Sequence, residues 1–286
     1  MTVLAMIFEV DPSLDNPDKL KSDTSLAEKA MEKYLKDRNG PLTVLPCSIT
    51  YVPLKHFASA EYLASLSAKA ASLSAGTADK QAILRKRLDG TANLGQIEYI
   101  FDLGNWSTFF KGEDGKQYGT MLQILQYPFS VGSIHIRPGS SGKATAEDKP
   151  SIDPAYYAGE HGGLDVEVMK ECVRFASSIA STDPLAGIIR QPASPDASTL
   201  RSEAKLREWI VRNTITDWHP VGTCGMGGRK GIEGGVVDER LRVYGVRGLR
   251  VVDASVMPLQ ISAHLQATVY AIAEKGAHMI LEDLTA

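Results

Sequence analysis

Residues 249–275 read LRVVDASVMPLQISAHLQATVYAIAEK, and this stretch carries the main clue to the fold. Its apolar run 249–252 predicts a short buried strand, and the apolar segment 265–281 predicts a helix that follows a polar turn. Asp253 closes the strand, and ligands of α/β proteins bind at the carboxyl ends of strands. His264 stands just ahead of the helix, where free backbone N–H groups can face a ligand. Strand, turn and helix in this order are typical of a nucleotide-binding crossover, although most α/β proteins contain such units.

A second informative stretch, residues 216–227, reads TDWHPVGTCGMG. It opens a glycine-rich region, since nine of the 25 glycines lie between residues 215 and 248. His219 stands before a proline, which favours an extended loop over a helix. From the residues alone several interpretations stay open: a histidine is more often structural than catalytic. Asp253 could equally cap a helix or a turn, and Cys224 is more often a packing residue than a nucleophile.

Several common site signatures are missing from the sequence. The dinucleotide fingerprint G-x-G-x-x-G fails, because the register that starts at Gly225 puts Lys230 in the third glycine position. There is no G-x-S-x-G elbow, no H-E-x-x-H and no Walker A loop. The three cysteines, Cys47, Cys172 and Cys224, do not have the spacing of a zinc site or a disulfide framework. We therefore expect reduced thiols and no metal site.

The composition is that of an ordinary globular protein. The 286 residues are 43% hydrophobic and 23% charged, which argues against a disordered or coiled-coil chain. A formal net charge of −3 gives no electrostatic case for binding nucleic acid or an anionic membrane. The apolar run 1–10 lacks the basic residues and cleavage site of a signal peptide and is too short to span a membrane, so it predicts a core strand. These features predict a cytoplasmic protein without nucleic-acid or membrane partners.

Local patterns between residues 25 and 213 predict further elements. A capping box at Ser25 and Glu28 predicts a helix that ends near Asn39 and Gly40. Two β-prone runs predict a hairpin, with strands at 118–127 and 131–137 and a turn at 128–130. Other helices are expected at 57–75, 78–88, 164–181 and 199–213, and an exposed loop at 138–154.

The two quoted stretches resemble the C-terminal signature of the glucose–methanol–choline (GMC) oxidoreductases, a family of flavoenzymes. The resemblance is close to residue by residue from His219 to Lys275. Upstream, residues 40–43 (GPLT), 126–136 and 153–157 resemble segments of the family's substrate-binding region, with Val131 where the family usually has arginine. The resemblance covers nearly the whole chain and is of the fungal type.

The resemblance also implies a site. His219 and His264 would be the active-site pair at the flavin, with His219 as the base and His264 as its partner. Asp253, Ala254, His264 and Thr268 would line the FAD cofactor. A neutral imidazole suits removal of an alcohol proton near pH 7. Trp218 and Tyr127 are candidates for shaping the substrate side, and core packing explains both equally well.

The resemblance implies an α+β fold for residues 1–214, an antiparallel sheet with flanking helices that corresponds to the substrate-binding domain. Residues 215–286 would be the strand and helix with which the chain returns into the FAD-binding domain. The N-terminal half of the family, which carries the dinucleotide fingerprint, has no counterpart in this sequence. Apolar surface around Val251, Val252 and the final helix should then be incompletely covered. We expect an N-terminal FAD-binding half or a second copy of the chain as partner.

The expected function is therefore FAD-dependent oxidation of the CH–OH group of a small-molecule alcohol or polyketide-like substrate, as in fungal secondary metabolism. Two alternatives stay open. The first is a non-redox descendant, a lyase or cyclase in which the histidines perform acid–base chemistry. The second is a truncated, flavin-free pseudoenzyme or binding module, because a chain without the fingerprint loses a major source of FAD affinity.

Overall fold

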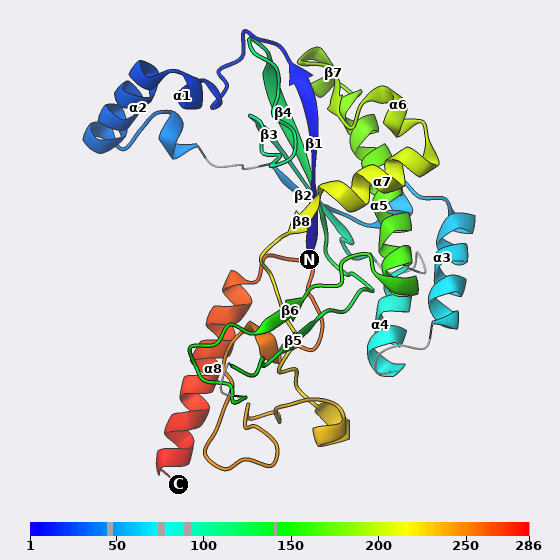
Figure 1. Cartoon of the computed structure of the whole chain (residues 1–286), viewed down its shortest axis with the longest axis vertical. Helices are drawn as coiled ribbons and strands as arrows, with labels where there is room; N and C mark the ends of the chain where they lie inside the picture. The colour runs from blue at the N-terminus through cyan, green and yellow to red at the C-terminus, as the bar shows by residue number, and fades with distance from the viewer. Residues whose placement is uncertain (45–47, 74–77, 89–92, 140–141, 286) are drawn as a thin grey trace.

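The computed structural model describes residues 1–44, 48–73, 78–88, 93–139 and 142–285. Its centre is an antiparallel sheet with the strand order β2-β3-β4-β1-β7, and β8 pairs with β1 beside β7 (Figure 1). The strands are β1 Thr2–Val10, β2 Ile49–Val52, β3 Ile97–Leu103, β4 Gln117–Leu125, β7 Ile189–Ser194 and β8 Thr214–Thr216. The predicted antiparallel sheet with flanking helices is thus confirmed.

Strand β1 is central because both of its faces are buried. Leu4, Met6 and Phe8 point to one face, and all three are at most 1% exposed. Val3, on the opposite face, is also buried. An apolar run of this kind, without polar alternation, is what a strand covered on both sides requires. The apolar N-terminal run therefore forms the predicted core strand.

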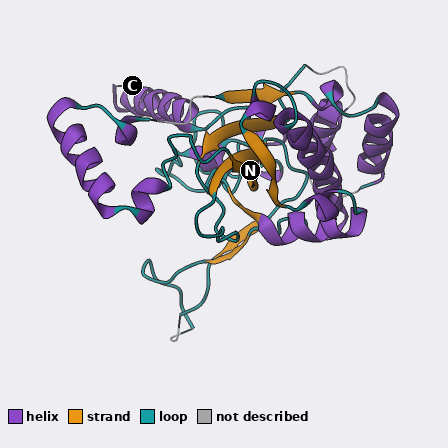
Figure 2. Cartoon of the chain, turned by 90° about the horizontal axis from the view of Figure 1, so that it is seen from above, coloured by secondary structure: helices purple, strands orange, loops and turns teal. Residues whose placement is uncertain are grey.

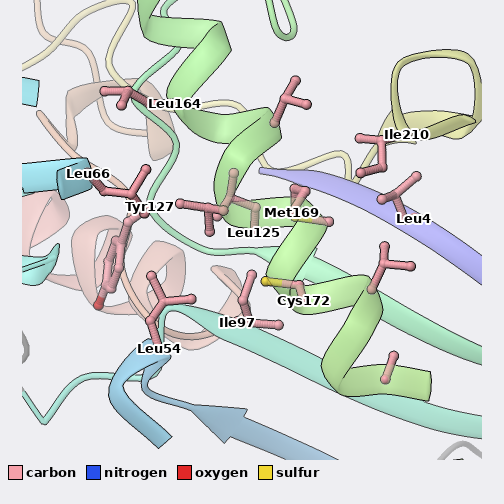
Figure 3. Close-up of a cluster of buried hydrophobic side chains, with 14 of the residues drawn as sticks. Leu4, Leu54, Leu66, Ile97, Leu125, Tyr127, Leu164, Met169, Cys172 and Ile210 are labelled. Carbon is pink, nitrogen blue, oxygen red and sulfur yellow. The ribbon is translucent and has the colours of Figure 1, made fainter. Parts of the chain in front are cut away.

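One face of the sheet is covered by helices, which form the main hydrophobic core. Helix α5 packs its inner side, including Met169 and Cys172, against Leu4, Ile97 and Leu125 of the sheet (Figure 3). Ile210, on α7, joins the same cluster. The helices are α1 Lys19–Ser22, α2 Thr24–Asp37, α3 Ala60–Ser72, α4 Ala78–Leu88, α5 Gly159–Ala180, α6 Ala197–Leu200, α7 Glu203–Asn213 and α8 Gln266–Thr285. The 3-10 turns are η1 Pro41–Thr43, η2 Leu54–His56, η3 Leu185–Gly187, η4 Gly228–Glu233 and η5 Ala254–Val256.

The opposite face of the sheet is covered by the C-terminal segment. Val3 and Ile124 pack there against Met257 and Leu265 in a second buried cluster. Viewed from above, helices lie on both sides of the strands (Figure 2). The segment that contains both candidate histidines therefore lies against the sheet.

Helix α8 is long but poorly covered. Among its described residues only Gly276 is buried, while Tyr270, Leu281 and Leu284 are 66%, 61% and 77% exposed. The helix descends along the lower left side of the view to the C-terminus (Figure 1). The exposed apolar side chains agree with the expectation of uncovered surface on the final helix. What covers them stays a prediction. No helix in the described part of the chain is long and apolar enough to cross a bilayer.

Several local predictions were wrong in ways that have a physical reason. Helix α2 begins two residues earlier than the capping box predicts, because the Asp23 carboxylate, not Ser25, accepts from the backbone N–H of Leu26 at 2.9 Å. It ends at Asp37, and the next residue, Arg38, adopts the left-handed conformation. The run 249–252 is not a strand; its only pairing in the described chain is a bridge between Arg242 and Arg250.

The predicted hairpin is also wrong. β4 ends at Leu125, and the next strand, β5 Ser133–His135, pairs with β6 Ser151–Asp153 in a separate small sheet. The turn between β4 and β5 is held by the buried carboxylate of Asp165 on α5. It accepts from the backbone N–H groups of Phe129 (2.7 Å) and Ser130 (2.9 Å) and from the Ser130 hydroxyl. Because these bonds direct the chain away from β4, β5 does not pair with β4. It pairs with β6, which lies within the expected loop 138–154.

Candidate active site

A row of side chains across the second face of the sheet leads to the candidate site. Ile215, Val3, Ile124, Glu98 and Tyr51 are direct partners on β8, β1, β4, β3 and β2. Direct partners point to the same face of a sheet. Four members of this row are apolar or aromatic, and the fifth is an acid. Glu98 is 0% exposed, so it needs polar partners from outside the sheet.

The C-terminal segment supplies one of those partners. Nε2 of His264 lies 2.8 Å from Oε1 of Glu98. The other oxygen, Oε2, accepts from Nε2 of Gln126 at 3.0 Å, and the Tyr51 hydroxyl also bonds to the carboxylate. Burial, and then the negative charge of Glu98, raise the pKa of Tyr51 to about 12. Glu98 thus fixes the orientation of His264 from beneath.

The second candidate histidine lies against the first. The rings of His219 and His264 have centroids 5.0 Å apart and planes inclined by 69°, an edge-to-face arrangement. The side chain of His219 is 19% exposed and that of His264 is 44% exposed. The structure therefore brings the two predicted active-site residues together at a position that solvent can reach.

The tautomer of His219 follows from its neighbour. Nδ1 contacts the backbone carbonyl oxygen of Asp217, which can only accept a hydrogen bond. Nδ1 therefore carries the proton, and Nε2 has a free lone pair. The backbone carbonyl of His219 accepts from the side-chain amide of Gln260. This arrangement holds the ring in the form that a general base requires.

Asp217 adds a carboxylate to the pair. Its Oδ2 lies 2.8 Å from Nδ1 of His219, in a contact outside hydrogen-bond geometry, and no other described group bonds to this oxygen. Burial raises the pKa of Asp217, and the two nearby imidazoles oppose that shift. Trp218, between Asp217 and His219, has φ 54° and is 73% exposed. A bulky side chain at positive φ marks a strained backbone of the kind that clusters at functional sites.

The remaining predicted residues lie around the next turn. The Asp253 carboxylate accepts from the backbone N–H of Ser255 at 2.8 Å and from its hydroxyl, and so caps η5, as the structural alternative anticipated. The backbone carbonyl of Ser255 accepts from the backbone N–H groups of Gly222 and Cys224, both at 3.1 Å, and these bonds connect this turn to the loop after His219. Cys224 is a half-buried free thiol, whereas Cys47 lies outside the described residues.

Ala254 and Thr268 are both half-buried. Ala254 packs against the second cluster, and Thr268 lies in the first turn of α8. Of the two aromatic candidates, Tyr127 is a buried core residue whose ring lies under the Arg87 guanidinium at 3.7 Å, and Trp218 is exposed. Tyr127 therefore has the packing role that the alternative interpretation gave it.

Residues 128–273, which include Asp217, His219 and His264, match the C-terminal sequence model of the family described as GMC oxidoreductase. The chain belongs to the GMC oxidoreductase family.

Named members of the GMC family resemble the chain to different extents. It is 30% identical to dehydrogenase mpl7 of Monascus purpureus over 99% of its own length and 46% of that protein. It is 36% identical to glucose oxidase 1 of Penicillium expansum over 56% of its length and 25% of that protein. Its fold is similar to the FAD-dependent oxidoreductase from Chaetomium thermophilum, with a TM-score of 0.78 at 22% identity, over 99% of the chain and 47% of that structure. The chain thus spans about half the length of the relatives that it matches along its whole length.

Three polar residues of this GMC site escaped the sequence analysis: Glu98, Gln126 and Asp217. Glu98 had a detectable signal, because it is a charged residue near the start of β3, whose other residues are apolar or aromatic except for Asp102. A charge in such a strand indicates a buried partner. Asp217 stands two residues from His219, but nothing local shows that its carboxylate is buried.

Proposed function

We propose that this GMC chain carries the proton-transfer residues of an FAD-dependent oxidoreductase that oxidises the CH–OH group of an alcohol. The observation that carries the proposal is the pair of imidazoles 5.0 Å apart, with Nε2 of His219 free to accept a proton. Oxidation of an alcohol requires a base for the hydroxyl proton while a hydride leaves the adjacent carbon. The family membership and the relatives named as a dehydrogenase and a glucose oxidase support this reaction class.

The roles of the residues follow from their contacts. His219 accepts the hydroxyl proton at Nε2, and Asp217 balances the charge that then forms on the ring. His264, oriented by Glu98, supplies a second hydrogen-bonding group to the alcohol oxygen. When bound, FAD supplies the hydride acceptor. Base catalysis of this kind is worth about 10²–10⁴-fold in rate.

The residues of this chain fit one edge of a flavin. The donor set there comprises His264, the hydroxyl of Thr268 and the first-turn N–H groups of α8, which have no partners within the helix. Such donors suit the carbonyl oxygens of the ring. Asp253 would hold its turn in place through Oδ1, which accepts from Ser255, and Oδ2 would face the flavin. The pyrophosphate fingerprint is not part of this sequence, so its binding residues would come from an N-terminal FAD-binding half.

The substrate class is a small alcohol or a polyketide-like molecule, as the fungal resemblance implies. The similarity to a fungal dehydrogenase over 99% of the chain supports the oxidative class. The exposed apolar side chains of α8 support a partner surface for the N-terminal half or for a second copy of the chain.

Addition of FAD to the purified chain tests the proposal. We expect FAD to bind at high concentration, more weakly than it would with the pyrophosphate-binding residues of an N-terminal half, and its fluorescence to be quenched. A panel of primary and secondary alcohols should be converted to carbonyl products only in its presence. The His278→Ala variant is a matched control, because His278 lies on α8 with a side chain 63% exposed. Product formation without FAD that requires both His219 and His264 would favour the non-redox alternative. A chain that neither binds FAD nor converts any alcohol would contradict the proposal for this chain.

A further inference from the structure

The candidate site contains three potential metal ligands. One ligand atom from each of Asp217, His219 and His264 lies within 4.8 Å of the other two. We propose that these residues form a binding site for a single divalent transition-metal ion of the zinc class. The inference does not depend on the proposed oxidation, because all three ligands belong to the chain itself.

The ligand set selects the class of ion. Two imidazoles and one carboxylate, with an open fourth position, are typical of Zn²⁺ sites. Mg²⁺ and Ca²⁺ prefer oxygen ligands and are poorly served by two histidines. The Oδ2 of Asp217 and Nδ1 of His219 are 2.8 Å apart. Ligand atoms at about 2.0–2.1 Å from one tetrahedral ion lie roughly 3.3–3.4 Å apart, so an increase of about half an ångström in their separation would admit the ion between these two atoms.

One carboxylate oxygen of Asp217 is available to bind an ion. The residue is 9% exposed, and its Oδ2 has no hydrogen-bond partner in the described part of the chain. A buried acceptor without a partner costs free energy, and a cation would remove that cost. His219 could bind through Nε2, or through Nδ1 after its proton moves to Nε2.

The contact between His264 and Glu98 has the arrangement found at metal sites. Metal-binding histidines almost always give their other ring nitrogen to a carboxylate or carbonyl group. Nε2 of His264 is held by the fully buried Glu98 at 2.8 Å, which leaves Nδ1 for an ion. Glu98 is itself held by Gln126 and Tyr51. The Asp217 and Glu98 carboxylates together match the charge of a divalent ion.

An ion at this site would have a functional consequence. The side chain of His264 is 44% exposed, so an ion could enter from solvent and keep a water molecule in the open position. By coordinating an imidazole nitrogen and the adjacent carboxylate, it would interfere with the proton acceptance that we assign to His219. Zinc should therefore inhibit any proton transfer at this site.

Isothermal titration of the chelator-treated full chain with ZnCl₂ tests the site directly. We expect one ion per chain, and no measurable binding of MgCl₂. Glu98→Gln should weaken zinc binding about 10–100-fold, as loss of the group that hydrogen-bonds a metal-binding histidine does elsewhere. His264→Ala and Asp217→Asn should weaken it more, since each removes a ligand. His278→Ala removes an exposed histidine outside the site and should leave the affinity unchanged.

X-ray absorption of the zinc-loaded wild-type chain gives a second readout that does not depend on the folding of variants. We expect two imidazole nitrogens and at least one carboxylate oxygen around the ion. No stoichiometric binding, or a spectrum without imidazole ligands, would overturn the proposal. Equal affinity in wild type, His264→Ala and Asp217→Asn, with folding checked by circular dichroism, would also overturn it. Zinc binding with no FAD-dependent activity would leave this inference standing and count only against the proposed oxidation.

Discussion

Nε2 of His264, just ahead of the last helix, lies 2.8 Å from Oε1 of Glu98, which is buried in strand β3 of the central sheet. This contact joins the C-terminal segment to the sheet. It places an imidazole at solvent with a carboxylate fixed beneath it. The same carboxylate contacts Tyr51, so its charge can be detected at a third residue.

Replacement of Glu98 by glutamine should lower the pKa of Tyr51. Burial is the largest cause of its rise to about 12, and the Glu98 charge is the next. The pKa should therefore move towards the ordinary value of about 10 without reaching it. Ultraviolet titration of phenolate formation measures the change, with Tyr51→Phe to identify the Tyr51 contribution. An unchanged titration would show that the Glu98 charge does not act on Tyr51.

The raised pKa of Tyr51 also predicts a loss of stability in alkali. A folded-state pKa above the unfolded value contributes stability that is complete below about pH 10 and is lost as pH rises through about 12. Urea unfolding at about pH 9 and about pH 11 should show a smaller decline in Tyr51→Phe than in wild type. An equal decline in both chains would contradict this reading of Tyr51.

Asp165 should make stability depend on pH in the mildly acidic range. Burial raises its pKa to about 6, although Phe129 and Ser130 donate to its carboxylate. The raised pKa contributes stability that is complete below about pH 4 and is lost as pH rises through about 6. Compared with Asp165→Asn, wild type should lose about 3 kcal/mol of unfolding free energy between these limits. The variant should be less stable at every pH, because an amide cannot accept from all three donors.

Denaturant unfolding across this pH range checks the Asp165 prediction. Asp196→Asn is a control, because the pKa of Asp196 is shifted in the opposite direction. Hydrogen bonds from Thr199 and Ser198 hold the pKa of the Asp196 carboxyl below its usual value. Its contribution to stability is therefore lost as pH falls. A difference between wild type and Asp165→Asn that stays constant from about pH 4 to about pH 7 would mean that the pKa of Asp165 is not raised.

Gly276→Ala should weaken the attachment of α8. A Cβ at Gly276 would lie 2.5 Å from Cγ1 of Val252, closer than carbon atoms approach without displacement. Overpacking of this kind costs about 1–3 kcal/mol, against which the alanine gains about 1 kcal/mol of helix propensity. Gly163→Ala in α5 is the matched control, because nothing lies within 4 Å of its Cβ position, and it should be neutral or stabilising. Thermal unfolding and limited proteolysis near α8 measure both; equal behaviour of the two variants would contradict the predicted contact.

Local patterns predicted those parts of the fold that local interactions determine. Helix α4 has the predicted bounds, and β1 is the predicted core strand. The hairpin after β4 was wrong because Asp165, on a distant helix, binds the backbone of the turn. The strand at 249–252 was wrong because apolar β-branched residues form a strand only where a neighbouring strand pairs with them.

The site shows the same division. The two histidines were paired by their resemblance to the GMC signature, and the structure places them together. Glu98 and Asp217 were missed because their roles come from burial and from contacts with residues far away in the sequence. Asp253 caps a local turn, as one interpretation of its position predicted, and its contact with the flavin stays a prediction.

The central claim is that His219 accepts the alcohol proton at a site that it shares with His264. Anaerobic mixing of the FAD-loaded chain with an alcohol substrate tests it directly, because flavin reduction appears as loss of its visible absorbance. The account predicts reduction that is slower by about 10²–10⁴-fold in His219→Ala than in wild type and unchanged in His278→Ala. Flavin reduction at the wild-type rate in His219→Ala would contradict it. So would a wild-type chain whose bound FAD is not reduced by any alcohol of the panel.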